Sequence, residues 1–218
     1  MVGVEAFKRD FESAKDLLPD LSFSADENGV PFVHGRIWLR DAHGVCIDHY
    51  LVRIVPTASY PFQFPLVFET GGRIPINFDW HVFEQDGHLC IRVLPEEIII
   101  CKKGLEFLSF IKEQLIPYLF NQKYREMNGY FLKERSHGDA GGIEYFQELF
   151  ATTDLKVIAQ GMAIVRSKRF PKRVANCFCG RKLKYRKCHR NAIAVTSQYS
   201  LKDLAYFFSM VLKEIESS

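Results

Sequence analysis

The sequence lacks a long apolar run. Its purely apolar stretches extend over only a few residues, far below the roughly 20 that a membrane-spanning helix requires. The first residues already mix acidic and basic side chains, so the apolar core of a secretion signal is also missing. These absences predict a cytoplasmic protein without a membrane partner. The six cysteines are then expected to act as thiols, metal ligands or nucleophiles rather than as disulfides.

Motifs of several large enzyme classes are missing as well. The sequence has no glycine loop that would bind phosphate, no Ser-His-Asp order and no conspicuous carboxylate pair, which argues against a nucleotide-dependent enzyme or a hydrolase. Internal repeats and low-complexity tracts are absent. What is present is an ordinary globular composition, 47% hydrophobic and 25% charged, in 218 residues. That length fits one domain of about 150 residues plus an appendage.

Acidic residues are absent from one long segment. No Asp or Glu occurs from Leu155 to Lys202, whereas Arg166 to Arg190 contains 11 Lys or Arg in 25 residues, and the remaining sequence is net acidic. This asymmetry indicates a two-part chain whose second part meets an acidic protein surface, a nucleotide or a nucleic acid. A solvated basic linker is the alternative interpretation.

The first third of the chain carries the pattern of one helix followed by strands. Apolar side chains recur at helical spacing over Glu5–Leu18, and Pro19 ends that helix. Pro31–Leu39 and Val45–Val55 are rich in β-formers and are separated by a turn at Asp41–Gly44. We therefore expect antiparallel strands after the helix.

Beyond the strands, the pattern becomes irregular and then helical again. Tyr60–Phe68 is expected to be extended, and Thr70–Gly87 is expected to form an irregular loop that leads to Cys90. Amphipathic helices are predicted over Leu105–Phe120, Ile143–Phe150 and Ser200–Ile215. The order of helix, strands, loop and helices predicts an α+β fold.

Two motifs carry a resemblance to a known family. Tyr60-Pro61-Phe62-Gln63-Phe64-Pro65, followed by Gly87-His88-Leu89-Cys90, resembles the ubiquitin-conjugating enzyme (UBC) family, and the resemblance covers about Glu5–Phe150. It implies a UBC-like fold: an N-terminal helix, an antiparallel four-stranded meander and C-terminal helices. Glu69–Leu94 is similar to bacterial members encoded in antiphage operons, whose partners are an activating enzyme, a ubiquitin-like modifier or a cGAS-like nucleotidyltransferase, and a target protein.

The resemblance implies transferase chemistry on Cys90, which would carry a modifier or a target's C-terminus as a thioester and pass it to an amine. The family's oxyanion-binding Asn is replaced here by Val82. His81 is therefore the candidate oxyanion donor, with backbone amides around Cys90 as a second possibility. His88, Arg92 and His137 are expected to lower the thiol pKa or orient a reactant. A buried structural cysteine and a turn-forming His81 are the alternatives.

A metal site is predicted near the C-terminus. The C-x-C-x8-C-H spacing places three thiolates and an imidazole within 13 residues, which fills a tetrahedral shell and predicts a structural Zn2+. The ligands would be Cys177, Cys179, Cys188 and His189. This segment resembles the SEC-C motif. Cys46 and Cys101 lie among Val and Ile and are expected to be buried.

These observations predict four parts: a UBC-like conjugating domain over residues 1–155, a basic linker over 156–176, a zinc knuckle over 177–190 and an amphipathic C-terminal helix over 191–218. Two functions compete with the transferase. One is a non-catalytic adaptor that binds a modifier and docks through the basic zinc tail. The other, ranked last, is a nucleic-acid-binding protein whose basic tail supplies the affinity.

Overall fold

The computed structural model describes residues 2–217, which form two compact units. The first, called the sheet unit, contains the residues up to Arg92 together with Ile100–Glu134. The second, the helical unit, contains Val93–Ile99 and the residues from Arg135 onward. None of the helices in residues 2–217 is both long and apolar enough to cross a bilayer.

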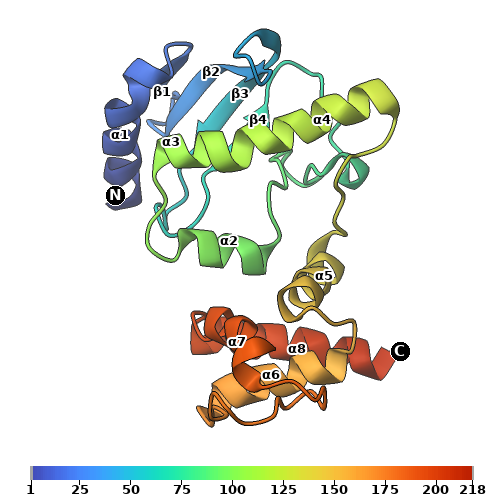
Figure 1. Cartoon of the computed structure of the whole chain (residues 1–218). Helices are drawn as coiled ribbons and strands as arrows, with labels where there is room; N and C mark the ends of the chain where they lie inside the picture. The colour runs from blue at the N-terminus through green and yellow to red at the C-terminus, as the bar shows by residue number, and fades with distance from the viewer. Residues whose placement is uncertain (1, 218) are drawn as a thin grey trace. The chain divides into compact units, whose positions relative to one another are not determined.

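The sheet unit begins with helix α1 (Val2–Ala14), which continues into a 3-10 turn over Lys15–Leu17. Four antiparallel strands follow in the spatial order β1-β2-β3-β4 (Figure 1). They are β1 (Leu21–Ala25), β2 (Pro31–Arg40), β3 (Cys46–Val55) and β4 (Leu66–Glu69). The predicted α+β class with an antiparallel four-stranded sheet is confirmed.

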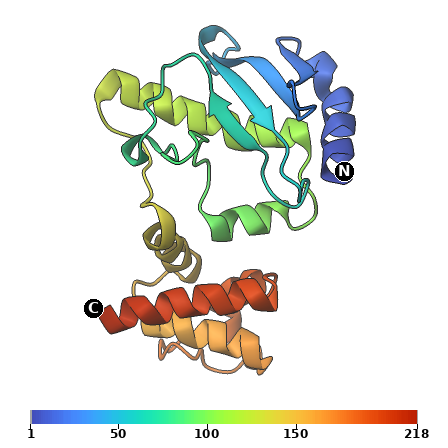
Figure 2. The same cartoon turned by 180° about the vertical axis from the view of Figure 1, so that it is seen from behind.

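One face of the sheet is apolar because successive side chains along a strand point to opposite faces. The register places Ile37 opposite Tyr50 and Ile54 opposite Val67, and all four side chains are buried. This face is covered by a long helical segment formed by α3 (Phe107–Phe110), a π-helical turn (Ile111–Leu115) and α4 (Ile116–Asn128). Both views show α4 running across the sheet (Figures 1 and 2).

Cysteine burial in the sheet unit follows position along the elements. Cys101, the last residue of α2 (Leu94–Cys101), is buried as predicted. Cys46 is exposed, so the prediction of burial was wrong. It is the first residue of β3, beside the register shift at Leu39/Arg40, and its neighbour Ile47 is exposed as well, so the alternation that buries Tyr50 and Val52 does not reach this end of the strand.

The helical unit contains α5 (Gly138–Phe150), α6 (Leu155–Ser167), α7 (Arg190–Thr196) and α8 (Leu201–Ser217), with a 3-10 turn over Tyr185–Lys187. Its core is built from one buried face of each long helix. The members that are at most 1% exposed are Phe146, Phe150, Ile158, Met162, Leu204, Phe207 and Val211.

The helical unit differs from the expected organisation in three places. Residues 135–155, expected to complete the UBC-like domain over 1–155, belong to this unit, because the buried face of α5 packs into its core. Residues 156–167, expected to lie in a basic linker, form most of α6, because Ile158, Met162 and Val165 share a face that packs into the core. Gly161 allows this packing, since a Cβ there would lie 2.3 Å from the ring of Phe150. The segment expected to hold one C-terminal helix contains two, α7 and α8.

Candidate functional site

The segment that ends at Cys90 is a short irregular hairpin. Val82 pairs with Leu89, and the amide of Phe83 donates to the carbonyl of His88 at 2.9 Å. The amide of Cys90 donates to the carbonyl of His81 at 2.8 Å. Because paired residues lie directly opposite each other, this register places His81 across from Cys90.

His81 and Cys90 are therefore brought together by backbone pairing. A ring nitrogen of His81 lies within 4.8 Å of the Cys90 Sγ, and both residues are partly exposed. His81 ends the 3-10 turn Phe78–Trp80 in a left-handed backbone conformation (φ 53°), and its amide donates to the carbonyl of Phe78 at 2.8 Å, so it also has the turn-forming role given as the alternative. Its ring packs edge-on against Phe131 at 4.9 Å between centroids.

Side chains of helix α4 hydrogen-bond to the backbone of the hairpin segment that contains His81. The hydroxyl of Tyr118 donates to the His81 carbonyl at 2.9 Å, and the buried amide of Gln122 donates to the Trp80 carbonyl at 2.7 Å. Burial raises the pKa of Tyr118 well above its usual range, so the hydroxyl keeps its proton and remains a donor. The guanidinium of Arg125 lies 4.4 Å from the Trp80 ring centroid. His81 is thus fixed by contacts to its own carbonyl, its ring and its neighbour.

The sequence predicts two alternatives for the oxyanion donor, the His81 ring and backbone amides around Cys90. Val82 is 1% exposed and belongs to the core. The amides of Leu89 and Cys90 already donate to the carbonyls of Val67 and His81, both at 2.8 Å, so the suggestion that backbone amides near Cys90 serve this role is wrong for these two. The His81 ring lies beside the thiol, within 4.8 Å of it.

The other candidate helpers have different surroundings. His88 is stacked on Phe83 with centroids 4.2 Å apart, and its Nδ1 lies 2.5 Å from a carboxylate oxygen of Asp86. Arg92 donates from Nε to the side-chain carbonyl of the buried Gln114 at 2.8 Å. His137 belongs to the helical unit, where it precedes the first residue of α5.

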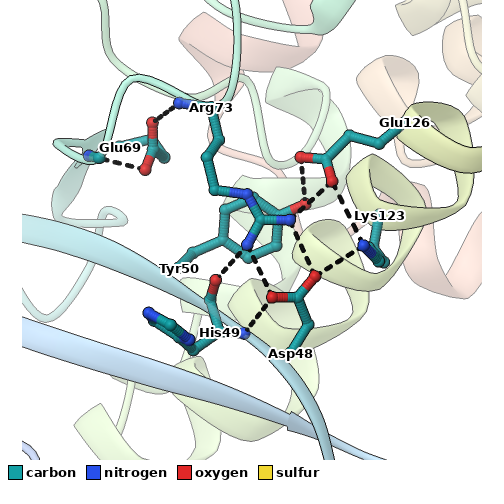
Figure 3. A network of polar contacts seen from close by, with 8 residues as sticks. Asp48, His49, Tyr50, Glu69, Arg73, Lys123 and Glu126 are labelled. Carbon is teal, nitrogen blue, oxygen red and sulfur yellow. Dashed lines mark hydrogen bonds and ion pairs between the residues drawn. The ribbon is translucent and has the colours of Figure 1, made fainter.

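A polar network that the sequence did not predict anchors the start of the loop (Figure 3). Arg73 binds both carboxylate oxygens of Asp48 at 2.8 Å and one of Glu126 at 2.6 Å, and its guanidinium lies 4.1 Å from the ring centroid of Tyr50. Lys123 binds Asp48 at 2.7 Å. The network connects the loop after β4 to β3 and α4, which restricts the loop that carries the His81–Cys90 pair.

The second site lies in the helical unit, where the four predicted metal ligands come together. Their ligand atoms all lie within 4.8 Å of one another. The Sγ atoms of Cys179 and Cys188 are 3.6 Å apart, and His189 Nδ1 lies 3.3 Å from Cys177 Sγ and 3.4 Å from Cys188 Sγ. A tetrahedral zinc ion with Zn–S of about 2.3 Å and Zn–N of about 2.0 Å would require separations of about 3.8 and 3.5 Å. Cys177, Cys179, Cys188 and His189 therefore lie close enough to hold a metal ion.

The imidazole is oriented for metal binding by its second nitrogen. His189 Nε2 lies 2.8 Å from the carbonyl oxygen of Phe150, which can only accept, so Nε2 carries the proton and Nδ1 presents its lone pair to the thiols. The backbone around the ligands is paired as well, because the amide of Cys177 donates to Leu183 and that of Tyr185 to Ala175, both at 2.9 Å. The donor set and its supporting bonds fit a closed structural metal centre.

Fold and sites together define a mixed α+β protein with a partly exposed cysteine beside a histidine, and with four residues in its helical unit that lie close enough to hold a metal ion. No family model, curated protein or solved structure matches this chain.

Proposed function

We propose that the chain is a ubiquitin-conjugating-like transferase that carries an acyl group as a thioester on Cys90. The observation that carries this proposal is the His81–Cys90 pair, which a hairpin, α4 and the Arg73 network hold at the end of an irregular loop. A thiol is suited to the task because its thiolate is a strong nucleophile and its thioester remains reactive toward amines.

The element order also supports the proposal. Along the chain, a helix and a four-stranded antiparallel meander come before Cys90, and the helix that covers the sheet comes after it. This is the order expected of a UBC-like fold. Fold alone does not define activity, so the proposed activity rests on Cys90 and its neighbours. The bacterial resemblance extends the proposal to antiphage defence, with an activating enzyme as donor and a phage or immune protein as target.

The reaction would proceed in two balanced steps. In the first, the Cys90 sulfur attacks the carbonyl carbon of the donor's thioester, a new C–S bond forms, the donor's C–S bond breaks, and the donor thiol takes a proton. In the second, an amine attacks the Cys90 thioester, a C–N bond forms, the C–S bond breaks, and Cys90 is released as a thiol. His81 would accept the thiol proton and, as a donor, stabilise the oxyanion of each tetrahedral intermediate.

The metal centre would have a structural role. We assign Zn2+ to Cys177, Cys179, Cys188 and His189, since three thiolates and one imidazole complete a tetrahedral shell and leave no position for a substrate. A bound zinc ion would cross-link the segment from Cys177 to His189, which has few buried side chains of its own. The identity of the metal is measured by intact mass under native conditions and by metal analysis of the purified protein.

Adduct formation tests the transferase proposal. The wild type, Cys90→Ala and Cys90→Ser are co-expressed with the proteins encoded beside the gene and analysed by intact mass before and after reduction. Cys46→Ala is the matched control, because Cys46 is an exposed thiol of the same unit. We expect an adduct in the wild type and in Cys46→Ala that reductant removes, none in Cys90→Ala, and a reductant-resistant oxyester in Cys90→Ser.

The opposite outcomes have defined meanings. An adduct that persists in Cys90→Ala would place the acyl group elsewhere and refute the role of Cys90. A stable complex with a neighbour protein that forms no adduct, and that Cys90→Ala leaves intact, would favour the adaptor. The observation that favours the adaptor function is that a buried Val82 stands where the UBC family has its Asn.

A further inference from the structure

A strongly basic surface surrounds the metal ligands. All eleven Lys and Arg side chains between residues 166 and 190 are exposed. They are Arg166, Lys168, Arg169, Lys172, Arg173, Arg181, Lys182, Lys184, Arg186, Lys187 and Arg190. We call this set the basic surface, and it belongs entirely to the helical unit.

Backbone pairing brings two parts of the basic surface together. Asn176 pairs with Lys184, and the amide of Arg186 donates to the carbonyl of Arg173 at 3.1 Å. Residues bonded in this way lie on adjacent strands about 5 Å apart, so the cations of 172–173 and of 184–187 are gathered on one short ribbon. The ribbon is connected to the metal ligands, because Cys177 and Cys188 lie within or directly after it.

The cations of the basic surface have no anionic partners within residues 2–217. No carboxylate of this part of the chain forms an ion pair with any of them. The contacts that they do make are to neutral groups: Arg181 donates to the carbonyl of Ala151 at 2.8 Å, Lys184 donates to Asn176 at 3.1 Å, and Arg166 lies over the Phe208 ring. Like charges closer than the Debye length of about 8 Å repel each other, so the arrangement costs folding free energy.

We propose that the basic surface binds the sugar-phosphate backbone of a nucleic acid, as a function additional to the thioester chemistry. A partner of uniform negative charge fits because the surface carries one sign over its whole length, whereas protein interfaces deplete charged residues at their centre and surround an apolar core. Phe170 is 51% exposed within the same segment and is available to stack on a base. The bonded ribbon and metal centre would present the cations with less loss of conformational entropy than a flexible tail.

Fluorescence anisotropy of labelled oligonucleotides tests the proposal with the full chain. The probes are a single-stranded DNA of about 20 nucleotides, a single-stranded RNA of the same sequence, a DNA duplex of the same sequence and a poly-glutamate peptide of equal charge. Each probe is titrated at several salt concentrations. We expect oligonucleotide binding that weakens steeply with salt, with a slope near −3 if about four phosphates are contacted, and weaker binding of poly-glutamate. The single-stranded and duplex arms identify the form of nucleic acid that is bound.

Charge reversal locates the surface. Lys172→Glu/Arg173→Glu should lower oligonucleotide affinity by about tenfold or more and reduce the salt slope. Lys102→Glu/Lys103→Glu is the matched control, with the same change in net charge on exposed side chains of the sheet unit, and it should change affinity little. Lys168→Glu/Arg169→Glu repeats the charge reversal at a part of the basic surface outside the ribbon. Unchanged metal content and circular dichroism show that each variant is folded.

Three results would overturn the proposal: no oligonucleotide binding at low salt, poly-glutamate binding as tight as oligonucleotide binding, or an equal loss of affinity in the control pair. The second of these would identify an acidic protein as the partner. The basic surface includes neither Cys90 nor His81, so failure here and failure of the transferase proposal are distinguishable.

Discussion

Replacing Arg73 by Met should destabilise the sheet unit more than any change of an exposed cation. The Arg73 side chain is 30% exposed and holds the carboxylates of Asp48 and Glu126, whose side chains are 18% and 20% exposed. Methionine keeps most of the stem but leaves the two carboxylates with Lys123 as their remaining cation. A hydrogen bond to a charged group contributes about 1.5–3 kcal/mol, and partial exposure screens it, so we expect a loss of about 2–3 kcal/mol in the free energy of unfolding.

Urea unfolding followed by tryptophan fluorescence measures this loss in the relevant unit. Trp38 and Trp80 are the two tryptophans of the chain, and both belong to the sheet unit. Arg9→Met is the control, because the Arg9 side chain is 76% exposed and its nearest carboxylate oxygen, on Asp10, lies 3.8 Å away. The control should change stability by less than about 0.5 kcal/mol.

The effect of Arg73 should depend on pH with a defined sign. The hydrogen bond from Arg73 holds the pKa of Asp48 well below its usual range. A depressed carboxyl pKa stabilises the folded state above the unfolded value of about 3.9, and this contribution is lost as the pH falls toward the folded value. The stability gap between the wild type and Arg73→Met should therefore be largest near neutral pH and shrink below about pH 4. A gap that stays constant down to pH 2, or that equals the gap for the control, would refute the reasoning.

Three further outcomes are expected. Gly161→Ala should lower the unfolding free energy of the helical unit by about 1–3 kcal/mol, measured by circular dichroism, because the new Cβ would meet Phe150 at 2.3 Å. Metal chelation should make the 168–189 segment sensitive to trypsin while the tryptophan fluorescence of the sheet unit stays unchanged; resistance to cleavage after chelation would contradict a stabilising metal. Iodoacetamide should modify Cys46 and Cys90 in the folded protein and spare Cys101, which is 1% exposed, as peptide mass mapping would show.

Sequence patterns predicted those parts of the fold that depend on local periodicity. β-forming residues predicted β2 and β3 nearly to the residue, and helical spacing predicted α1, α5 and α8. The predicted helix Leu105–Phe120 matches α3, the π-helical turn and the first residues of α4, but α4 continues to Asn128. The metal ligands were found because four donors within 13 residues can meet without help from the rest of the chain. In each case the structure follows from neighbours in sequence.

The unpredicted features depend on contacts between distant residues or on competing patterns. The Arg73 network joins residues 48, 73, 123 and 126, and only the folded sheet and α4 bring them together. The sequence predicts a basic linker over 156–176, where most of α6 forms, because the Lys and Arg residues after position 165 dominate the composition of that segment. Cys46 is exposed at the end of β3 beside the register shift at Leu39/Arg40, and strand periodicity does not predict such a shift.

The pairing of His81 with Cys90 is a property of the hairpin register rather than of either side chain. Both backbone bonds that set this register, from Cys90 to His81 and from Phe83 to His88, involve main-chain atoms only. A shift by one residue would place Trp80 or Val82 opposite the thiol and turn the alternate side chains to the other face. The buried Val82 and Leu89 oppose such a shift, because it would move both from the core toward water. Substitution of the His81 side chain should therefore remove the imidazole while the thiol keeps its position.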